Sequence, residues 1–347
     1  MKDINPYLIQ ETDNILLAFE KLNKVPQHLT LFVVDEKQIL KGTLTDGDIR
    51  RGFLKGLQLG DPVSSFMSTT YSYIHENELV PEKINLIKKK GVRLLPVLGD
   101  KLELIKIIDL VKKSTLLPID AVIMAGGKGE RLGSLTRNTP KPLLKIGSKS
   151  ILEHNLERLS KYGINHVHIT INHMGDKIME HFGDQYNDDM TIRYVREEKP
   201  LGTAGALSMI SAFTQKYILL MNADLFTNID LEGLYNDLLS NNADMAIATS
   251  SYSINVPYAV LKTTGEEIKS IEEKPTYTYY ANAGIYLFKR ELVDFIPGNQ
   301  YYDITDLIEY LLKEKRKIIK SPIIGYWIDI GKPEDFQKAR ELYQHLR

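Results

Sequence analysis

Three glycines that follow a short apolar run at residues 121–125 have the types and spacing of a phosphate-binding loop. The apolar run predicts a short buried strand. Gly126, Gly127 and Gly129 carry no Cβ, so we expect the chain to turn there with positive φ angles and to leave its amides open. Exposed backbone N–H groups bind phosphate oxygens. The loop therefore predicts contact with a polyphosphate.

Two cations follow this glycine loop. Arg131 offers a bidentate donor, and Lys141, which stands between two prolines, offers a point charge on a stiffened backbone. The order of residues fits neither the G-x-G-x-x-G loop of dinucleotide folds nor the G-x-x-x-x-G-K-[ST] loop of P-loop proteins. It resembles the GGxGxRLxxLTxxxPKP motif of the sugar-1-phosphate nucleotidyltransferases, and every fixed position of that motif is present from Gly126 to Pro142.

Length and composition bound the class of protein. The chain has 347 residues, which predicts two domains, and its formal charge of −1 gives no general attraction to nucleic acid or to an anionic membrane. The sequence contains no cysteine, which excludes disulfides, thiolate catalysis and cysteine-based zinc sites. The start of the chain is polar and no apolar run reaches the length of a membrane span. We therefore expect a cytoplasmic protein.

Residues 1–115 contain an internal repeat of helices and strands. The first copy, at about 7–60, and the second, at about 61–113, each predict a helix, two strands and a second helix. The duplicated pattern resembles a tandem CBS (Bateman) module. The expected helices are at 14–22, 46–54, 81–89 and 109–113, and the expected strands at 29–34, 39–43, 93–98 and 102–107.

The first copy carries Gly-Thr-Leu-Thr-Asp-Gly-Asp at 42–48, which resembles the element with which CBS modules hold a nucleotide. The resemblance implies that Thr45 lies near a phosphate and Asp48 at the ribose of an adenine nucleotide. The second copy has Lys106 where threonine is expected, so one ligand site is favoured over two. The alternative is that Thr45 or Asp46 caps the following helix and that the module is structural or forms dimers. The resemblance implies a homodimer or a higher homo-oligomer.

A short apolar connection, with residues 116–120 as the linker, leads to the second domain at 121–347. There, strands alternate with helices, which predicts a Rossmann-like nucleotidyltransferase domain with a mixed, mostly parallel sheet. The overall fold class is therefore α/β. The expected helices are at 150–162, 175–182 and 205–211, and the expected strands at 166–172, 191–195 and 217–221. Ligands of such sheets bind beyond the carboxyl ends of the strands.

The resemblance implies that the loop after the strand at 191–195 receives the nucleobase. By resemblance, a carboxylate ahead of a glycine reads the base, and the backbone of Gly202 and Thr203 closes over it. Either Glu197 or Glu198 fits that position, because a carboxylate accepts from the N1–H and N2–H₂ edge of guanine, whereas adenine offers no such donor pair. The alternative is that both glutamates are solvated loop charges.

Two aspartates at the ends of apolar strands predict a magnesium site. Asp224 follows the strand at 217–221, and Asp329 lies in Trp-Ile-Asp-Ile-Gly near the C-terminus. Mg²⁺ is bound by one or two carboxylates together with substrate phosphates. Both positions match the metal-binding pair of the family.

A third group of residues is expected to bind the sugar phosphate. Glu273 and Lys274 lie in an E-E-K-P element, in which the family's lysine meets the sugar phosphate and its glutamate the sugar. Asn282 and Gly284 lie in a Y-x-N-x-G-I-Y element that lines the family's sugar pocket. Taken alone, these two elements would favour a plain surface turn followed by a core strand.

Together these motifs imply transfer of a nucleotidyl group from a nucleoside triphosphate to a hexose 1-phosphate, with release of pyrophosphate. The catalytic residues would be Arg131, Lys141, Asp224 and Lys274, and the nucleotide-binding residues would include Ala125. The domain order is similar to that of the guanylyltransferases of bacterial legionaminic acid synthesis, which favours GTP and glucosamine 1-phosphate. One alternative is another pair of nucleotide and sugar, with mannose or glucose 1-phosphate as the acceptor. Two others are an inactive nucleotide-sensing regulator and a glycosyltransferase, although the D-x-D motif of a glycosyltransferase is missing.

Overall fold

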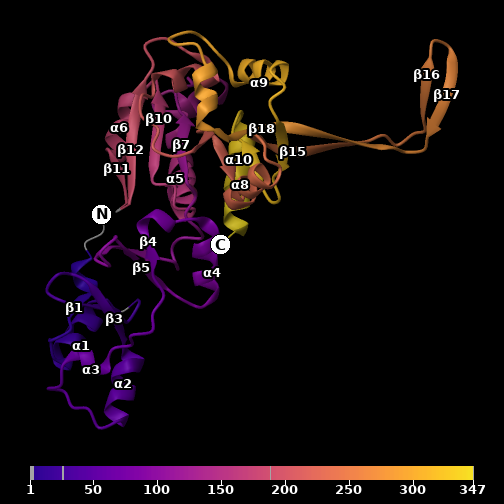
Figure 1. Ribbon diagram of the computed structural model, residues 1–347. Helices are drawn as coiled ribbons and strands as arrows, with labels where there is room; N and C mark the ends of the chain where they lie inside the picture. Colours follow the sequence, from indigo (N-terminus) through magenta and orange to yellow (C-terminus); the bar gives the residue numbers. More distant parts are fainter. Residues whose placement is uncertain (1–3, 26, 188, 347) are drawn as a thin grey trace. The chain divides into compact units, whose positions relative to one another are not determined.

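A computed structural model describes residues 4–25, 27–187 and 189–346 (Figure 1). The chain divides into two compact units, with the main boundary between Leu117 and Pro118. Among the described residues, no helix has the length and apolar character needed to cross a bilayer.

The N-terminal unit contains two three-stranded sheets with the same plan. In each sheet the first two strands are parallel and the third is antiparallel to the second. The first sheet consists of β1 (Leu8–Gln10), β2 (Thr30–Val34) and β3 (Leu40–Thr45), and the second of β4 (Ile74–His75), β5 (Leu94–Leu98) and β6 (Leu104–Asp109). The helices are η1 (Asn5–Tyr7), α1 (Ile15–Lys24), α2 (Asp46–Leu54), α3 (Val63–Phe66), η2 (Glu76–Glu78) and α4 (Pro81–Lys89).

The two halves of this unit share a hydrophobic core. Phe32 and Leu40 of the first half pack in one buried cluster with Leu94 and Leu98 of the second. In the stretch 109–113, where the sequence predicted a helix, Asp109 ends β6 and residues 110–112 form a turn instead. The reason is local, because the Asp109 carboxylate accepts hydrogen bonds from the amides two and three residues ahead and so closes a turn.

The C-terminal unit is built on an eight-stranded mixed sheet, which confirms the predicted α/β fold. The strand order is β11-β12-β10-β7-β13-β18-β15-β19, in which β12, β10, β7 and β13 are parallel and β18 is antiparallel to both of its neighbours. The strands are β7 (Ile119–Met124), β10 (His166–Ile171), β11 (Gln185–Tyr186), β12 (Met190–Arg196), β13 (Tyr217–Asn222), β15 (Met245–Asn255), β18 (Thr276–Lys289) and β19 (Ile318–Pro322).

Helices and short strands complete this unit. They are η3 (Glu130–Thr136), η4 (Lys141–Leu143), β8 (Lys145–Ile146), β9 (Lys149–Ser150), α5 (Ile151–Lys161), α6 (Gly175–Phe182), α7 (Gly202–Gly205), η5 (Ala206–Met209), β14 (Leu225–Thr227), α8 (Leu231–Ser240), η6 (Arg290–Phe295), α9 (Ile304–Lys313), β20 (Trp327–Asp329) and α10 (Pro333–His345). The helix predicted at 205–211 is thus replaced by two short turns of helix. The central strands β7 and β13 are buried along nearly their whole length, which is why they read as continuous apolar runs.

Two residues assigned to the linker belong to β7. Ile119 opens the strand, and Asp120 is fully buried within it. The Asp120 carboxylate accepts hydrogen bonds from the backbone N–H of Thr214 and of Gln215 and from the Thr214 hydroxyl. A buried carboxylate is stable when its oxygens are satisfied in this way. Asp120 therefore fixes β7 to the segment that leads into β13.

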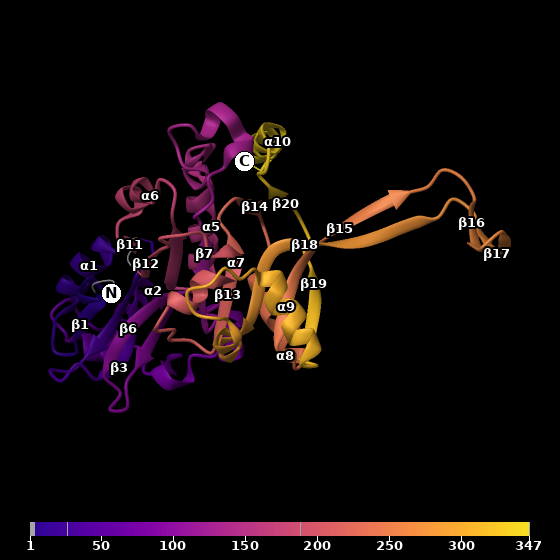
Figure 2. The ribbon, with the colours of Figure 1, turned by 90° about the horizontal axis from the view of Figure 1, so that it is seen from above.

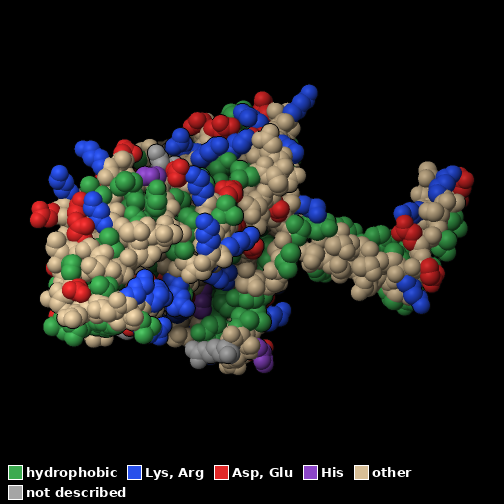
Figure 3. Space-filling view, turned by 60° about the horizontal axis from the view of Figure 1, so that its bottom comes forward, with side chains coloured by type: hydrophobic (Ala, Val, Ile, Leu, Met, Phe, Trp, Pro, Cys, Tyr) green, Lys and Arg blue, Asp and Glu red, His purple; other side chains and the backbone are tan. Residues whose placement is uncertain are grey.

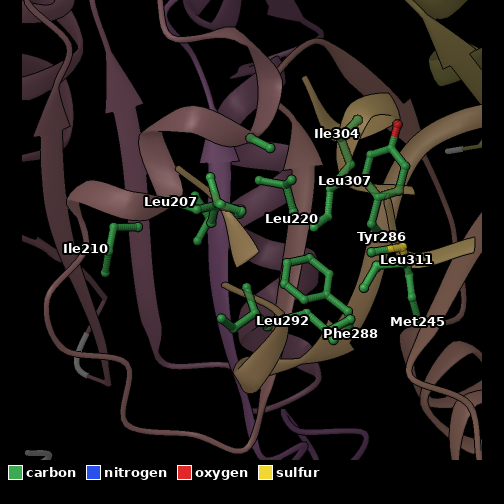
Figure 4. Close-up of a cluster of buried hydrophobic side chains, with 14 residues drawn as sticks. Leu207, Ile210, Leu220, Met245, Tyr286, Phe288, Leu292, Ile304, Leu307 and Leu311 are labelled. Carbon is green, nitrogen blue, oxygen red and sulfur yellow. The ribbon is translucent and has the colours of Figure 1, made fainter. Parts of the chain in front are cut away.

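A hydrophobic cluster holds α9 against the sheet (Figure 4). Ile304, Leu307 and Leu311 recur at helical spacing on one face of α9, and they pack with Leu220 of β13 and Phe288 of β18. Full burial of each such side chain stabilises the fold by roughly 1.5–3 kcal/mol. The cluster sets the position of the amino end of α9 relative to β13.

Strands β15 and β18 continue well beyond the sheet as a two-stranded ribbon (Figures 1 and 2). The pairing of β15 with β19 ends at Thr249, and that of β18 with β13 ends at Ile285. Farther out, β16 (Val260–Thr264) and β17 (Glu267–Glu272) form a separate antiparallel pair at the end of the ribbon. We call residues 250–281 the arm.

Candidate active site

The glycine loop leaves the carboxyl end of β7, as the sequence predicted, but its glycines serve different purposes. Gly129 has a positive φ of 67°, whereas Gly126 and Gly127 do not, which corrects the expectation that all three turn in this way. A Cβ at Gly126 would lie 3.3 Å from both the Asn172 Cβ and the Glu197 Oε1. At Gly127 none of the described atoms lies within 4 Å of such a Cβ. Gly126 permits close packing, and Gly127 leaves its backbone open.

A pocket of about 420 Å³ lies over this loop. It brings together residues from the glycine loop, from η3 and η4, from the end of β13 and from the segment after β20. The predicted site residues that line it are Ala125, Gly127, Gly129, Arg131, Lys141 and Asp224. The sequence motifs that are farthest apart in the chain therefore meet at the carboxyl ends of the parallel strands.

Lys141 and Asp224 form an ion pair within the pocket. Pro140 precedes η4 in an extended conformation and directs Lys141 inward, where the residue is 8% exposed. The Lys141 Nζ donates to Oδ2 of Asp224. The other oxygen of Asp224, Oδ1, is buried and has no hydrogen-bond partner among the residues that the structure describes. Sequence reasoning identified both residues but missed their pairing.

Asp329 lies beside Asp224 because β14 and β20 are antiparallel. Asp329 is opposite Leu225, and the N–H of Ile330 donates to the backbone oxygen of Asp224 at 3.1 Å. Asp329 is exposed on its outer side, yet desolvation by the atoms packed against its carboxyl raises the pKa of that group above the usual range, and the Asp224 carboxylate adds to this rise. Lys141 and Arg131 oppose the rise in the pKa.

The two aspartates fit a divalent cation that is also held by its substrates. The structure offers an unpartnered Asp224 oxygen and a neighbouring carboxyl whose ionisation is disfavoured, and a cation would relieve both conditions. Among the described residues, no group of three or more carboxylate, histidine or cysteine side chains is placed to hold a metal. Mg²⁺ suits such a site, since it takes one or two carboxylates together with phosphate oxygens and water.

The two candidate base-reading glutamates differ in position. Glu197 is half-buried next to Gly126, and its Oε2 accepts from the N–H of Leu201 at 3.0 Å. Its backbone oxygen accepts from the side-chain amide of Asn172. Glu198 is exposed. The structure therefore places Glu197, and not Glu198, against the glycine loop.

Gly202 and Thr203 dock onto the start of α9. The Thr203 N–H and hydroxyl both donate to the Asp303 carboxylate, and the Thr203 hydroxyl accepts from the N–H of Ile304. We expected the Thr203 backbone to close over a base, but its N–H is already used by Asp303. Gly202 has a φ of 77°, and a Cβ there would lie 2.7 Å from the Tyr302 oxygen. Asp303 was missed in the sequence, where its capping pattern before α9 was the available signal.

The predicted sugar-phosphate residues are divided between two places. Gly284, with a φ of 70°, lies against Asn222 at the end of β13, and its N–H donates to the side chain of Asn282. Glu273 and Lys274 lie in the arm, between β17 and β18. Lys274 is eight residues from Asn282, which corresponds to about 26 Å of extended chain. The expectation that Lys274 joins Lys141 in the pocket of its own chain is therefore wrong.

Thr45 and Asp48 of the N-terminal unit form a capping box on α2. The Thr45 hydroxyl accepts from the Asp48 N–H, and the Asp48 carboxylate accepts from the Thr45 N–H. The same carboxylate pairs with Arg51. These bonds account for both residues as helix-capping groups. Binding of an adenine nucleotide by Thr45 and Asp48 stays a prediction.

Comparison with known proteins places this pocket in a family. The sequence profile of the nucleotidyl transferase family matches residues 120–345. The chain belongs to this family. Its sequence is 31% identical over 229 residues to a mannose-1-phosphate guanylyltransferase of Mycobacterium tuberculosis, which covers 64% of this chain and 63% of that protein. It is 28% identical over 233 residues to a D-glycero-alpha-D-manno-heptose 1-phosphate guanylyltransferase of Aneurinibacillus thermoaerophilus, which covers 65% of this chain and 99% of that protein.

A solved structure is similar as well. A putative glucose-1-phosphate thymidylyltransferase of Bacillus anthracis matches with a TM-score of 0.54 and 25% sequence identity, over 66% of this chain and 96% of that one. The match to the Mycobacterium tuberculosis protein spans less than two thirds of that relative's length. The similarity thus covers the C-terminal unit and its pocket.

Proposed function

We propose that the chain transfers a guanylyl group from GTP to a hexose 1-phosphate, with glucosamine 1-phosphate as the preferred acceptor. The products are then a GDP-sugar, GDP-glucosamine, and pyrophosphate. The observation that carries this proposal is the meeting of the glycine loop, Arg131 and the Lys141–Asp224 pair in one pocket of a nucleotidyl transferase.

The glycine loop and Arg131 bind the triphosphate. Gly127 leaves its backbone open to the pocket, so phosphate oxygens can approach the amides of the loop. Arg131 is exposed, lines the pocket and supplies a planar pair of donors for the leaving phosphates. The acceptor phosphate is already anionic at neutral pH, so the attack on the α-phosphorus needs little acid or base catalysis. Catalysis then consists of positioning and of charge neutralisation.

Asp224 and Asp329 are the residues that would hold Mg²⁺. When bound, the ion neutralises the charge that develops on the phosphates. Lys141 holds Asp224 in place through its ion pair, and it lines the same pocket. Lys141 therefore orients the carboxylate and adds positive charge close to the reacting phosphates.

Glu197 reads the base. Its Oε2 is held by the Leu201 N–H, and its Oε1 faces the position of a Cβ on Gly126. A fixed carboxylate accepts from the donors of guanine and meets no such donor pair on adenine. Glu197→Gln should lower the preference for GTP over ATP by about tenfold or more, because an amide offers both a donor and an acceptor. Glu198→Gln is the matched control and should leave the preference unchanged.

The choice of glucosamine 1-phosphate rests on the order of the two units, which resembles that of guanylyltransferases of legionaminic acid synthesis. The product would then serve the synthesis of nonulosonic acids or surface glycans. Relatives named for mannose and heptose 1-phosphates keep another acceptor as the second candidate. Consumption of a nucleoside triphosphate fits a cytoplasmic protein.

Pyrophosphate release with Mg²⁺ tests the function over a grid of five nucleoside triphosphates and four sugar 1-phosphates, namely glucosamine, N-acetylglucosamine, glucose and mannose. Selective turnover of GTP with glucosamine 1-phosphate is expected. Turnover of another pair keeps nucleotidyl transfer and rejects the substrate choice. No turnover with any pair, with and without adenine nucleotides, favours the inactive regulator.

The N-terminal unit is a CBS pair in this proposal and holds one adenine nucleotide at Thr45 and Asp48. Its support is the shared plan of the two halves and the G-x-x-T-x-x-D element. Calorimetric titration of the full chain with AMP and ADP should give binding that Thr45→Ala weakens, with Thr30→Ala as the control. If neither AMP nor ADP gives a heat of binding, Thr45 and Asp48 serve only as a helix cap.

A further inference from the structure

The arm is a ribbon with one apolar face and one polar face. Residues directly opposite each other on paired strands share a face. Tyr252 is opposite Tyr279, and Ile254 is opposite Tyr277, which gives an apolar face. The polar face carries hydrogen-bonded side chains, with Ser253 bonded to Thr278 and Asn255 bonded to Thr276.

The apolar face of the arm is exposed. Between residues 252 and 280, all of which the structure describes, eight large hydrophobic side chains are exposed. Three of them, Tyr252, Ile254 and Tyr279, lie on the apolar face, Tyr280 lies on the other face opposite Ser251, and Tyr258, Leu261, Ile268 and Ile271 lie farther out. Figure 3 shows hydrophobic side chains along the ribbon and at its end. An isolated two-stranded ribbon is marginally stable in water, and antiparallel sheets usually pack one face against a core. The arm therefore requires a surface that covers it.

A contact with β19 holds the base of the arm. Lys320 of β19 lies over the ring of Tyr280, with its Nζ 3.5 Å from the ring centroid. The hydrogen bonds on the polar face continue the pairing outward. Both ribbon views show β16 and β17 far from the sheet of their own unit (Figures 1 and 2). These contacts hold the two strands together and join the base of the ribbon to β19.

The charged residues of the pocket indicate which molecule the arm covers. Among the described residues that line the pocket, the cations are Lys128, Arg131 and Lys141. Lys141 is paired with Asp224, and the Lys128 Nζ lies 3.7 Å from Glu130. The need for one more cation rests on the proposed function. There, a second anion, the sugar phosphate, must approach the negatively charged triphosphate. Arg131 alone is left without an ion pair in this described lining, and the proposed function assigns it to the triphosphate, so no unpaired cation of the lining remains for the sugar phosphate.

Lys274 is a cation of the arm that forms no ion pair with the residues that the structure describes. It is exposed and holds a φ of 44°, a left-handed conformation that costs a residue with a side chain about 1–2 kcal/mol. Such conformations persist where the surrounding structure or function requires them. The arm thus presents an exposed lysine together with an uncovered apolar face.

We propose that the arm docks on a second copy of this chain, and that Lys274 of one protomer completes the sugar-phosphate site of its partner. The exchange is reciprocal in a twofold dimer, so each pocket receives one arm. The apolar face then supplies the contact area, and Lys274 supplies the cation that each pocket lacks.

A complementation experiment tests the exchange through activity. Arg131→Ala inactivates the pocket of a chain and keeps its arm, whereas Lys274→Ala inactivates the arm and keeps the pocket. Each variant alone should lose about 100-fold or more in rate. Hetero-dimers, co-expressed and purified through two different tags, contain one pocket with Arg131 that receives Lys274 from the partner. Their rate should recover to about half that of the wild type.

Lys269→Ala is the matched control for the arm, since Lys269 pairs with Glu267 on β17 and should be dispensable. Hetero-dimers that are as inactive as both parents would overturn the exchange, because they would show that each arm serves its own chain. A wild-type rate in Lys274→Ala alone would also overturn the proposal, because it would show that no pocket needs Lys274.

Cross-linking tests the exchange without activity. The chain has no cysteine, so Lys274→Cys creates a single labelling site for a photoreactive maleimide. Labelled ¹⁵N chains are mixed with unlabelled ¹⁴N chains under conditions of subunit exchange. Cross-links from the ¹⁵N arm to ¹⁴N peptides of the segment 125–142 are expected. Cross-links confined to one isotope would overturn the proposal.

Variants on the two faces of the ribbon separate docking from other sources of dimerisation. Tyr252→Ser with Tyr279→Ser should abolish the mixed-isotope cross-links, whereas Ser253→Ala with Thr278→Ala, on the polar face, should keep them. Equal loss in both pairs would contradict docking through the apolar face. If the wild type turns over no substrate pair but gives mixed cross-links, the proposed function fails and the exchanged arm stands.

Discussion

Replacement of Lys141 by methionine should destabilise the C-terminal unit and then be rescued by a second substitution. Methionine keeps an unbranched side chain of similar length but removes the charge. The side chains of Lys141 and Asp224 are 10% and 24% exposed, and Oδ1 of Asp224 already has no hydrogen-bond partner among the described residues. Loss of one partner of a buried pair costs about 3–5 kcal/mol, and partial exposure of Asp224 reduces this to about 2 kcal/mol.

Urea unfolding followed by tryptophan fluorescence measures this cost. Trp327 is the single tryptophan of the chain and lies on β20, with its indole N–H donating to the Ala283 oxygen. Its fluorescence therefore reports on the unit that holds the pocket. With an m value of about 2 kcal/mol/M, the unfolding midpoint of Lys141→Met should fall by about 1 M in the absence of Mg²⁺.

The double variant decides whether the pair itself is responsible. Lys141→Met with Asp224→Asn removes both charges, so most of the lost stability should return, to within about 1 kcal/mol of the wild type. Mg²⁺ should raise the midpoint of Lys141→Met more than that of the wild type, because the two aspartates are then no longer neutralised. An unchanged midpoint in Lys141→Met, or a double variant whose loss equals the sum of the single losses, would refute the reasoning.

Other substitutions test the loop and the second aspartate. Gly127→Ala should leave the fold intact, since a Cβ there meets no described atom within 4 Å, but weaken GTP binding about tenfold in a calorimetric titration by covering the amides. Gly126→Ala instead places its Cβ 3.3 Å from the Glu197 Oε1, so it should reduce the preference for GTP over ATP. An unchanged GTP affinity in Gly127→Ala together with an unchanged preference in Gly126→Ala would contradict these roles. The pKa of Asp329 is raised in the folded protein, so ionisation of this carboxyl destabilises the fold as pH rises from about 4 through the folded pKa. Without Mg²⁺, Asp329→Asn should therefore match the wild type near pH 3 and have the higher urea midpoint at pH 7, and a lower midpoint at pH 7 would be inconsistent with the raised pKa.

Local signals in the sequence predicted individual elements well. The predicted bounds of α2, 46–54, agree with the structure because Thr45 and Asp48 form a capping box within four residues. The loop after β7 was predicted because its glycines and Arg131 lie close together in the sequence. Asp120 was assigned to a linker because nothing in the sequence nearby indicates that its carboxylate is bound by residues 214 and 215.

Features set by distant residues were not predictable in this way. The pairing of Lys141 with Asp224 joins residues 83 positions apart, and each alone read as a ligand of substrate or metal. Lys274 and Asn282 are close in sequence, and they were expected in one pocket. The continuous pairing of β15 with β18 carries Lys274 away from the sheet, because a strand extends about 3.3 Å with each residue.

The fate of the α-phosphate tests the central claim most directly. GTP labelled with ³²P at the α-phosphorus is incubated with glucosamine 1-phosphate, Mg²⁺ and the full chain, and the labelled products are separated and identified by mass. Attack by the sugar phosphate on the α-phosphorus predicts that the label enters a GDP-sugar, with one unlabelled pyrophosphate released for each molecule formed. Label that stays in GTP, or that appears in GMP with no sugar attached, would contradict nucleotidyl transfer to the sugar phosphate.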